Sequence, residues 1–155
     1  MKNKEVIEKL IKKKISISST ESCTGGKFAN EITSVPNSSK IFNFGLITYS
    51  NKSKQNFLNV KKTSLKKHGA VSAQVCKEMV EGLYKISKSK ICISTTGIAG
   101  PKGGNKFKPV GLVYIGFKYN KKTKIYEFNF NKRLNRKKIQ TLSVNSIFKL
   151  ISLSI

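Results

Sequence analysis

Three short segments of the sequence combine hydroxyl, amine and glycine groups in patterns that could support nucleophilic catalysis. They are TESCTGG at 20–26, TYSNKSK at 48–54 and TGIAGPKGG at 96–104, and each follows an apolar stretch typical of a buried strand. A serine at a strand–helix turn is a potential nucleophile, and a lysine of lowered pKa is a potential base. Glycine-rich backbone can supply N–H groups to an oxyanion.

The first segment places Ser22 between a strand and a helix. Free N–H groups and the helix dipole also make such a helix start a potential anion site, where Gly25 and Gly26 would let a ligand approach the backbone. The alternative is structural, because Ser22 or Thr24 can simply cap the helix. Glu21 either orients the site or bonds to the neighbouring loop.

The other two segments could supply the base and the oxyanion donors. Partial burial would lower the pKa of Lys54 enough for it to serve a serine, as in Ser–Lys enzymes. The glycine-rich segment 96–104 is either an oxyanion site or a flexible loop. Cys23 is either a rival nucleophile or a small packed residue, and Cys76 and Cys92 fall on apolar positions. His68 could complete a triad, but its pairing with a glycine is typical of a helix end.

The composition excludes several other kinds of site. The 155 residues include 31 Lys and Arg, 7 Asp and Glu and 1 His, for a formal net charge of +24. Every acid is Glu, which excludes an EF-hand loop and an Asp-held magnesium ion. The single His excludes a His-rich zinc site, and the 3 cysteines lack CxxC spacing. We expect no metal, no cofactor and no disulfide framework, in a protein of the reducing cytoplasm.

The basic charge has two interpretations. Lysines occur throughout the chain, and Arg133 and Arg136 are its only arginines. Recognition of bases and phosphates favours the bidentate arginine fork, so this pattern favours a lysine-rich solvated surface. The alternative is a functional polyanion-binding face. Either surface would attract anionic ligands, small phosphates included.

Hydrophobic periodicity predicts alternating helices and strands in one domain, 1–155. We expect helices over 3–14, around 28–32, within 51–67, from a Ser72 cap to about Ser87 with Ile86 facing inward, and over about 134–152. We expect strands over 15–19, 42–50, 91–95, 110–119 and 124–130. This alternation predicts an α/β fold, and the closing hairpin makes its sheet mixed. Lysines among the apolar N-terminal residues predict neither a signal peptide nor a membrane span.

Taken together, the segments resemble a known family. ESCTGG (21–26), VPNSS (35–39), FGLITYSNKSK (44–54), HGAVS (68–72), TGIAGPKGG (96–104) and KPVGLVYIGF (108–117) occur in the order and with the spacing of the C-terminal domain family of competence-damage-inducible protein A. The resemblance is strongest to its stand-alone members, the nicotinamide-nucleotide amidohydrolases. It implies a three-layer α/β/α sandwich with a mixed, mostly parallel sheet. It also implies hydrolysis of nicotinamide mononucleotide to nicotinate mononucleotide and ammonia, in pyridine nucleotide salvage.

The same resemblance assigns roles to individual residues. It implies Ser22 as the nucleophile, Lys54 as the general base, Tyr49 as a tyrosine that assists the base, and Thr96 on the oxyanion side. The substrate-binding residues that we expect are Glu21, Thr24, Gly25, Gly26, Gly97, Gly100 and Arg133. We further expect a homo-oligomer with no membrane association and at most non-specific contact with nucleic acid.

The chain departs from the family pattern at three lysines. Lys52 and Lys102 stand where acids are common, and Lys137 stands where a second arginine is usual. These departures concern contacts to phosphate or ribose rather than the Ser–Lys chemistry. The rival interpretation, from another class of function, is a catalytically silent binding protein linked to DNA uptake or repair.

Overall fold

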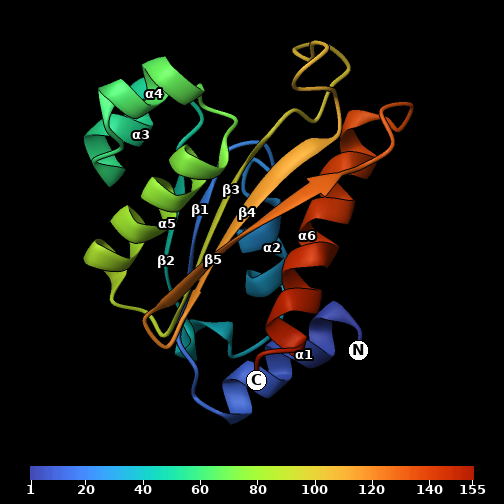
Figure 1. The fold of residues 1–155 in the computed structure, drawn as a ribbon. Helices are drawn as coiled ribbons and strands as arrows, with labels where there is room; N and C mark the ends of the chain where they lie inside the picture. The colour runs from blue at the N-terminus through green and yellow to red at the C-terminus, as the bar shows by residue number, and fades with distance from the viewer.

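A five-stranded mixed sheet forms the middle layer of the protein, and the computed structural model describes all residues 1–155 (Figure 1). The strands are β1 (Ile17–Glu21), β2 (Phe42–Ile47), β3 (Ile91–Gly97), β4 (Leu112–Tyr119) and β5 (Lys122–Asn129), in the spatial order β2-β1-β3-β4-β5. β2 and β3 both pair in parallel with β1, whereas β4 and β5 join by antiparallel pairing. Four of the five strands run in the same direction and only β4 runs in the opposite direction, so the sheet is mostly parallel in strand direction. Because β4 lies between β3 and β5, two of the four strand pairs are nevertheless antiparallel.

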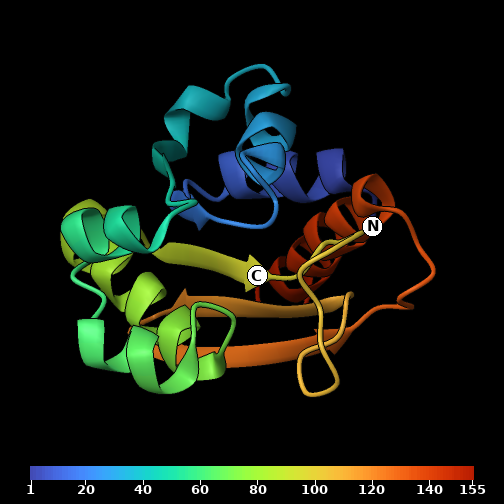
Figure 2. The same ribbon diagram turned by 90° about the horizontal axis from the view of Figure 1, so that it is seen from above.

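Helices cover both faces of the sheet, which confirms the predicted α/β/α sandwich. α1 (Asn3–Lys12), α2 (Lys27–Thr33) and α6 (Arg136–Ser152) lie on one face, and α5 (Ala73–Ser87) packs on the other. α3 (Asn51–Leu58) and α4 (Lys62–His68) pack against α5. Figure 2 shows the sheet between these two groups, and a 3₁₀ turn, η1 (Ser38–Lys40), precedes β2. None of the helices is long and apolar enough to cross a membrane.

Each face of the sheet has its own apolar core. Ile91 and Ile93 of β3 belong to the core beneath α1, α2 and α6, whereas Cys92 between them belongs to the core beneath α5. This is the two-residue alternation of a strand that is covered on both faces. Gly82 lets α5 approach the end of α3, because a Cβ at this position would collide with the carbonyl oxygen of Leu58.

Several element boundaries differ from the sequence-based expectation. β1 spans 17–21 rather than 15–19, because hydroxyl pairs satisfy the buried side chains of Ser18 and Thr20 inside the protein, whereas the hydroxyl of Ser19 has no partner. Ser18 bonds to Ser89 at 2.5 Å and Thr20 bonds to Thr48 at 2.9 Å. The predicted short helix and connector within 51–67 is in fact two helices, α3 and α4. Ile86, expected to face inward, is 47% exposed near the end of α5.

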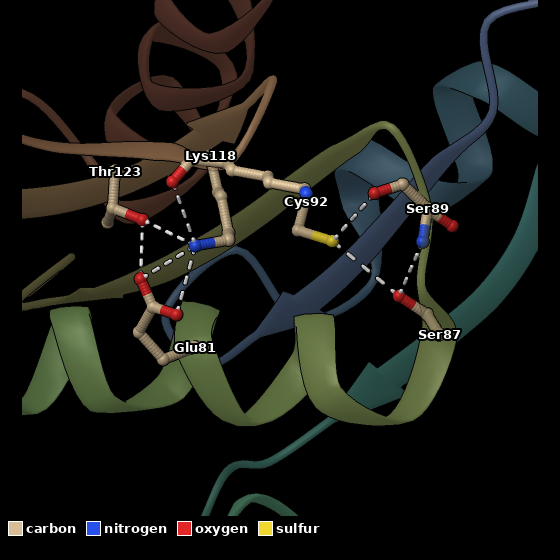
Figure 3. Close-up of polar contacts among 7 residues, drawn as sticks. Glu81, Ser87, Ser89, Cys92, Lys118 and Thr123 are labelled. Carbon is tan, nitrogen blue, oxygen red and sulfur yellow. Dashed lines mark hydrogen bonds and ion pairs between the residues drawn. The ribbon is translucent and has the colours of Figure 1, made fainter.

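A polar cluster fixes the β4–β5 hairpin to α5 (Figure 3). The Nζ of Lys118 donates to both carboxylate oxygens of Glu81 and to the hydroxyl of Thr123, each at 3.1 Å, and Thr123 also donates to Glu81. Partial burial raises the pKa of Glu81, but the hydrogen bonds from Thr123 and Lys118 outweigh it and leave the pKa below its ordinary value. Lys118 pairs with Cys92 near the start of β3, so this cluster lies at the opposite end of the sheet from Gly97.

Candidate active site

Ser22 lies just beyond the carboxyl end of β1, which runs between β2 and β3. Its N–H donates to the carbonyl oxygen of Thr95 at 3.1 Å and to the Thr95 hydroxyl at 3.3 Å, which anchors it to β3. Gly25 and Gly26 then turn the chain into α2 with φ angles of +59° and +90°, a conformation that favours glycine. The turn therefore places Ser22 at the edge of the sheet where ligands of open α/β sheets bind.

Helix α3 brings the amine of Lys54 to this serine. Ser50 caps the helix, since its hydroxyl accepts a hydrogen bond from the N–H of Ser53 at 3.0 Å, and Lys54 follows within the first turn. The Nζ of Lys54 lies 3.1 Å from the Oγ of Ser22 and 2.7 Å from the carbonyl oxygen of Thr48. A longer contact of 3.5 Å reaches the carbonyl oxygen of Tyr49. The amine thus has three acceptors and lies in a side chain that is only 1% exposed.

Burial lowers the pKa of Lys54 below its ordinary value. No carboxylate opposes this shift, because the two ion pairs of the protein are Lys4–Glu8 and Lys118–Glu81. A neutral amine would keep two N–H donors on the two carbonyl oxygens and direct its lone pair at the hydroxyl of Ser22. The contacts of Lys54 therefore suit a general base.

The neighbouring thiol is chemically quiet. Burial raises the pKa of Cys23 to about 12, so the thiol stays protonated near neutral pH. Cys23 also belongs to the apolar core beneath α1, α2 and α6, which supports its interpretation as a small packed residue. Cys76 and Cys92 are buried as well, as their apolar positions in the sequence predicted.

Ser22 and Lys54 line a pocket of about 260 Å³. Four further residues that were expected to act in catalysis or substrate binding, Tyr49, Thr96, Gly97 and Gly100, line the same pocket. Its apolar lining comes mainly from Ala70, Val71, Ile98 and Ala99, and its cations are Lys102 and Arg136. The hydroxyl of Thr96 donates to the carbonyl oxygen of Ala70 at 2.8 Å and so ties the segment before α5 to the end of β3.

Several backbone N–H groups among the residues that line this pocket have no hydrogen-bond partner in the protein. They include those of Cys23, Ala99 and Gly100, and all three of these residues are buried. Buried N–H groups are nearly always paired, so a group of free donors beside a serine is unusual. Stabilisation of an oxyanion requires free donors of this kind. In the glycine-rich loop the free donors are backbone N–H groups, whereas the hydroxyl of Thr96 already donates to the carbonyl oxygen of Ala70.

Sequence reasoning missed Arg136. Its Nη1 donates to the carbonyl oxygen of Gly100 at 2.9 Å and its Nη2 donates to the hydroxyl of Tyr49 at 2.8 Å, so it joins two walls of the pocket. Arg133, expected from the sequence instead, is exposed and does not line the pocket. Asn135 caps α6 and makes Arg136 its first residue, a signal visible in the sequence. Nothing local, however, relates that helix start to Ser22.

The other expected binding residues form the turn behind the pocket. The carboxylate of Glu21 is 1% exposed and accepts four hydrogen bonds. Its donors are the hydroxyl of Thr24 and the N–H groups of Gly26, Phe28 and Ala29, at 2.6 to 3.1 Å. The anion site expected at the start of α2 is therefore already filled by the protein's own carboxylate. Neither Glu21 nor residues 24–26 line the pocket.

No metal-binding cluster accompanies the pocket, since no group of three or more His, Cys, Asp or Glu lies together. His68 is not among the residues that line the pocket either. It is the last residue of α4, and Gly69 follows with a φ of +75°, as the helix-end interpretation of this pair predicted. Ser22 and Lys54 are thus the serine and lysine pair that meets at this pocket.

These features define a class: an α/β/α domain in which a serine at a strand end and a buried lysine share one pocket. The chain belongs to the CinA C-terminal domain family, whose model matches residues 1–155. The CinA-like protein of Endomicrobium trichonymphae is 49% identical to it over 142 residues, which are 92% of this chain and 33% of that protein. The chain spans about a third of the length of the curated relatives it matches.

Solved structures show the same fold. The competence/damage inducible protein CihA from Agrobacterium tumefaciens matches with a TM-score of 0.93 and 32% identity, over 99% of this chain and 93% of that one. A CinA superfamily protein from Escherichia coli matches with a TM-score of 0.91 and 25% identity, over 99% of this chain and 88% of that one. The sheet and its two helical layers are thus common to these family members.

Proposed function

We propose that this protein hydrolyses the carboxamide of nicotinamide mononucleotide to nicotinate mononucleotide and ammonia. The observation that carries the proposal is the 3.1 Å contact between the Lys54 amine and the Ser22 hydroxyl in a buried position at the pocket. Amide hydrolysis needs a nucleophile, a proton shuttle and donors for the oxyanion, and the pocket offers all three. The choice of amide follows the resemblance of the site segments to nicotinamide-nucleotide amidohydrolases.

In the first half of the reaction, neutral Lys54 accepts the hydroxyl proton of Ser22 as the Oγ attacks the amide carbon. The carbonyl oxygen of the substrate becomes an oxyanion, which the free N–H groups of Cys23 and Ala99 or Gly100 stabilise. The C–N bond then breaks, and the ammonium of Lys54 returns its proton to the departing nitrogen. Ammonia leaves, and the nicotinoyl group remains as an ester on Ser22.

In the second half, water replaces ammonia. Lys54, again neutral, accepts a proton from the water as it attacks the ester carbon, and the same N–H groups hold the second oxyanion. The ester C–O bond breaks, the proton passes from Lys54 to the Oγ of Ser22, and nicotinate mononucleotide is released. The two carbonyl oxygens that bind Nζ keep the amine in place through both proton transfers.

The pocket also suits the rest of the substrate. Ala70, Val71 and Ile98 provide apolar walls for a flat pyridinium ring, while Arg136 and Lys102 place two cations among the lining residues for the 5′-phosphate. With the start of α2 filled by Glu21, these cations are the phosphate partners that the site itself offers. The overall charge of +24 adds a field that attracts the anionic nucleotide.

The direct test is ammonia release from nicotinamide mononucleotide by the purified protein, with nicotinate mononucleotide quantified by chromatography. We expect equal amounts of both products from the wild type and neither from Ser22→Ala. Unchanged turnover in Ser22→Ala would remove the proposed nucleophile. A wild-type protein that releases no ammonia from this nucleotide, but does so from another amide in a substrate panel, would replace the substrate while keeping the chemistry.

A further inference from the structure

We propose that Glu21 and Thr24 are positioning residues, which set the direction of a hydrogen-bond chain that ends on the N–H of Ser22. The chain runs from Ser22 through Thr95 and Thr24 to the Glu21 carboxylate, and no member except Ser22 lines the pocket. The inference rests on the proposed function, because it assigns these residues to the same nucleophile.

Glu21 defines one end of this chain without ambiguity. An ionised carboxylate has no hydrogen to donate, so each of its four partners must donate to it. Three of these are backbone N–H groups at the start of α2, and the fourth is the hydroxyl of Thr24, at 2.6 Å. Glu21 forms no ion pair, so these neutral donors alone stabilise its buried charge.

The direction of the remaining bonds follows from hydrogen counting. Thr24 has a single hydroxyl hydrogen, which it gives to Glu21. In the contact of 2.8 Å between the hydroxyls of Thr24 and Thr95, Thr95 must therefore be the donor. The Thr95 oxygen is then left as an acceptor, and the N–H of Ser22 donates to it at 3.3 Å. A buried carboxylate thus determines the orientation of a hydroxyl two hydrogen bonds away.

Two consequences follow for the site. The peptide of Ser22 is held to β3 by both the carbonyl oxygen and the hydroxyl of Thr95, which keeps Oγ within reach of Lys54. The same carboxylate occupies the N–H groups at the start of α2, so a substrate anion cannot bind there and must turn toward Arg136 and Lys102. Glu21 therefore acts on both the nucleophile and the orientation of the nucleotide, without touching substrate.

The test removes one hydroxyl from the chain. Glu21→Gln is the obvious variant, but an amide NH₂ in place of one oxygen would face a backbone N–H and could prevent folding. Thr24→Val keeps the shape and removes the hydroxyl. We expect it to lower kcat roughly 10- to 100-fold with KM changed less than about twofold, as for a misplaced nucleophile. Thr24→Ser keeps the hydroxyl and should recover most of the lost kcat.

Ser18→Ala is the matched control. It breaks the buried hydroxyl pair of Ser18 and Ser89 in β1, the strand that leads to Ser22. Ser18 lies four residues and about 13 Å from Ser22. This variant should lower the thermal midpoint about as much as Thr24→Val and leave kcat unchanged. An unchanged kcat in Thr24→Val would overturn the inference, as would a loss that Ser18→Ala reproduces or that Thr24→Ser does not relieve.

A second readout separates this inference from the proposed function. If the wild type releases no ammonia from nicotinamide mononucleotide, the proposed substrate is wrong, but the rate at which a fluorophosphonate labels Ser22 still measures the nucleophile. Thr24→Val should slow this labelling by roughly the same factor, and Thr24→Ser should not. Equal labelling rates in the wild type and Thr24→Val would overturn the inference, and so would a wild-type Ser22 that resists the probe.

Discussion

The amine of Lys54 lies 3.1 Å from the hydroxyl of Ser22, although the two residues are 32 positions apart in the chain. The end of β1 holds the serine, and the first turn of α3, which follows the neighbouring strand β2, holds the lysine. Parallel pairing of β1 with β2 places the ends of both strands at one edge of the sheet. The short connection from β2 to α3 is therefore sufficient to join the two side chains.

Removal of either side chain should abolish the proposed hydrolysis. For Ser22→Ala and for Lys54→Met we expect kcat to fall by at least about 1,000-fold. The first variant lacks the nucleophile, and the second lacks the base that accepts the proton of the serine hydroxyl. Ammonia release under saturating nicotinamide mononucleotide measures this loss. Lys52→Met, in the same helix but exposed and outside the pocket, is the control that should retain activity. A Lys54→Met protein that keeps wild-type kcat would eliminate the lysine as the base.

The pH dependence of kcat/KM should report Lys54. The reaction needs the neutral amine, so the rate should rise with pH as Lys54 loses its proton. Because burial lowers the pKa of Lys54, the rise should be complete at a pH below that of an ordinary lysine. Initial rates across a pH series, with circular dichroism to confirm folding at each point, provide the measurement. A midpoint at or above 10.5, the ordinary lysine value, would contradict the assignment.

Lys54→Met should make the protein more stable while it destroys activity. Burial penalises the ammonium, so between the folded pKa and 10.5 the unfolded chain binds more protons, and stability rises with pH. Methionine removes this penalty, and we expect the free energy of unfolding to rise near neutral pH. Urea unfolding at two pH values would show the gain and its decrease toward high pH. Lys52→Met should change neither, and a destabilised Lys54→Met would show that the amine contributes to folding.

The two arginines can be distinguished with two substrates. Arg136→Met should lower kcat/KM for nicotinamide mononucleotide by roughly 10- to 100-fold, the loss expected for a hydrogen bond to a charged group. It should affect nicotinamide riboside, which lacks the phosphate, far less. Loss of the hydrogen bonds from Arg136 to Gly100 and Tyr49 should affect both substrates equally, so the comparison with the riboside isolates the contact to the phosphate. Arg133→Met should have little effect on either substrate, and the reverse ranking would restore Arg133 as the phosphate partner.

Much of the fold was accessible from the sequence, because apolar periodicity reports burial. The Ser72 cap of α5 is an example, since its hydroxyl accepts from the N–H of Val75 as the sequence predicted. The extension of β1 through Thr20 and Glu21 was not accessible, because those polar residues are satisfied by partners that no local pattern reveals. Apolar periodicity predicts which segments are buried, whereas the burial of a polar residue depends on a hydrogen-bond partner that is distant in the sequence.

The site divides in the same way. Ser22, Lys54 and the glycine-rich loop were brought together through family resemblance, and their local patterns alone left a cap, a surface lysine and a loop as alternatives. Arg136 was missed because its partners, Gly100 and Tyr49, lie 36 and 87 positions away. For Glu21 the sequence left two alternatives, a place at the ligand or bonds to the neighbouring loop, and its four donors in the turn after β1 agree with the second. Contacts between distant segments decide both positions, so only the folded chain could assign them.

The polar cluster at the far end of the sheet offers a test of stability that is independent of the pocket. Glu81→Gln leaves the buried ammonium of Lys118 without its carboxylate (Figure 3). We expect a loss of about 1–3 kcal/mol at pH 7, below the range for a fully buried pair because the side chain of Glu81 is 34% exposed. Since the pKa of Glu81 is lowered in the folded protein, the contribution of Glu81 to stability is complete above about pH 4.5 and disappears as the pH falls through the folded value.

Denaturant unfolding at pH 7 and below pH 4 should show that the difference in the free energy of unfolding between Glu81→Gln and the wild type becomes smaller in acid. Glu8→Gln, which breaks the exposed pair with Lys4, should cost less than about 0.5 kcal/mol at either pH. A gap that persists unchanged in acid would show that Glu81 stabilises the hairpin by packing rather than by charge.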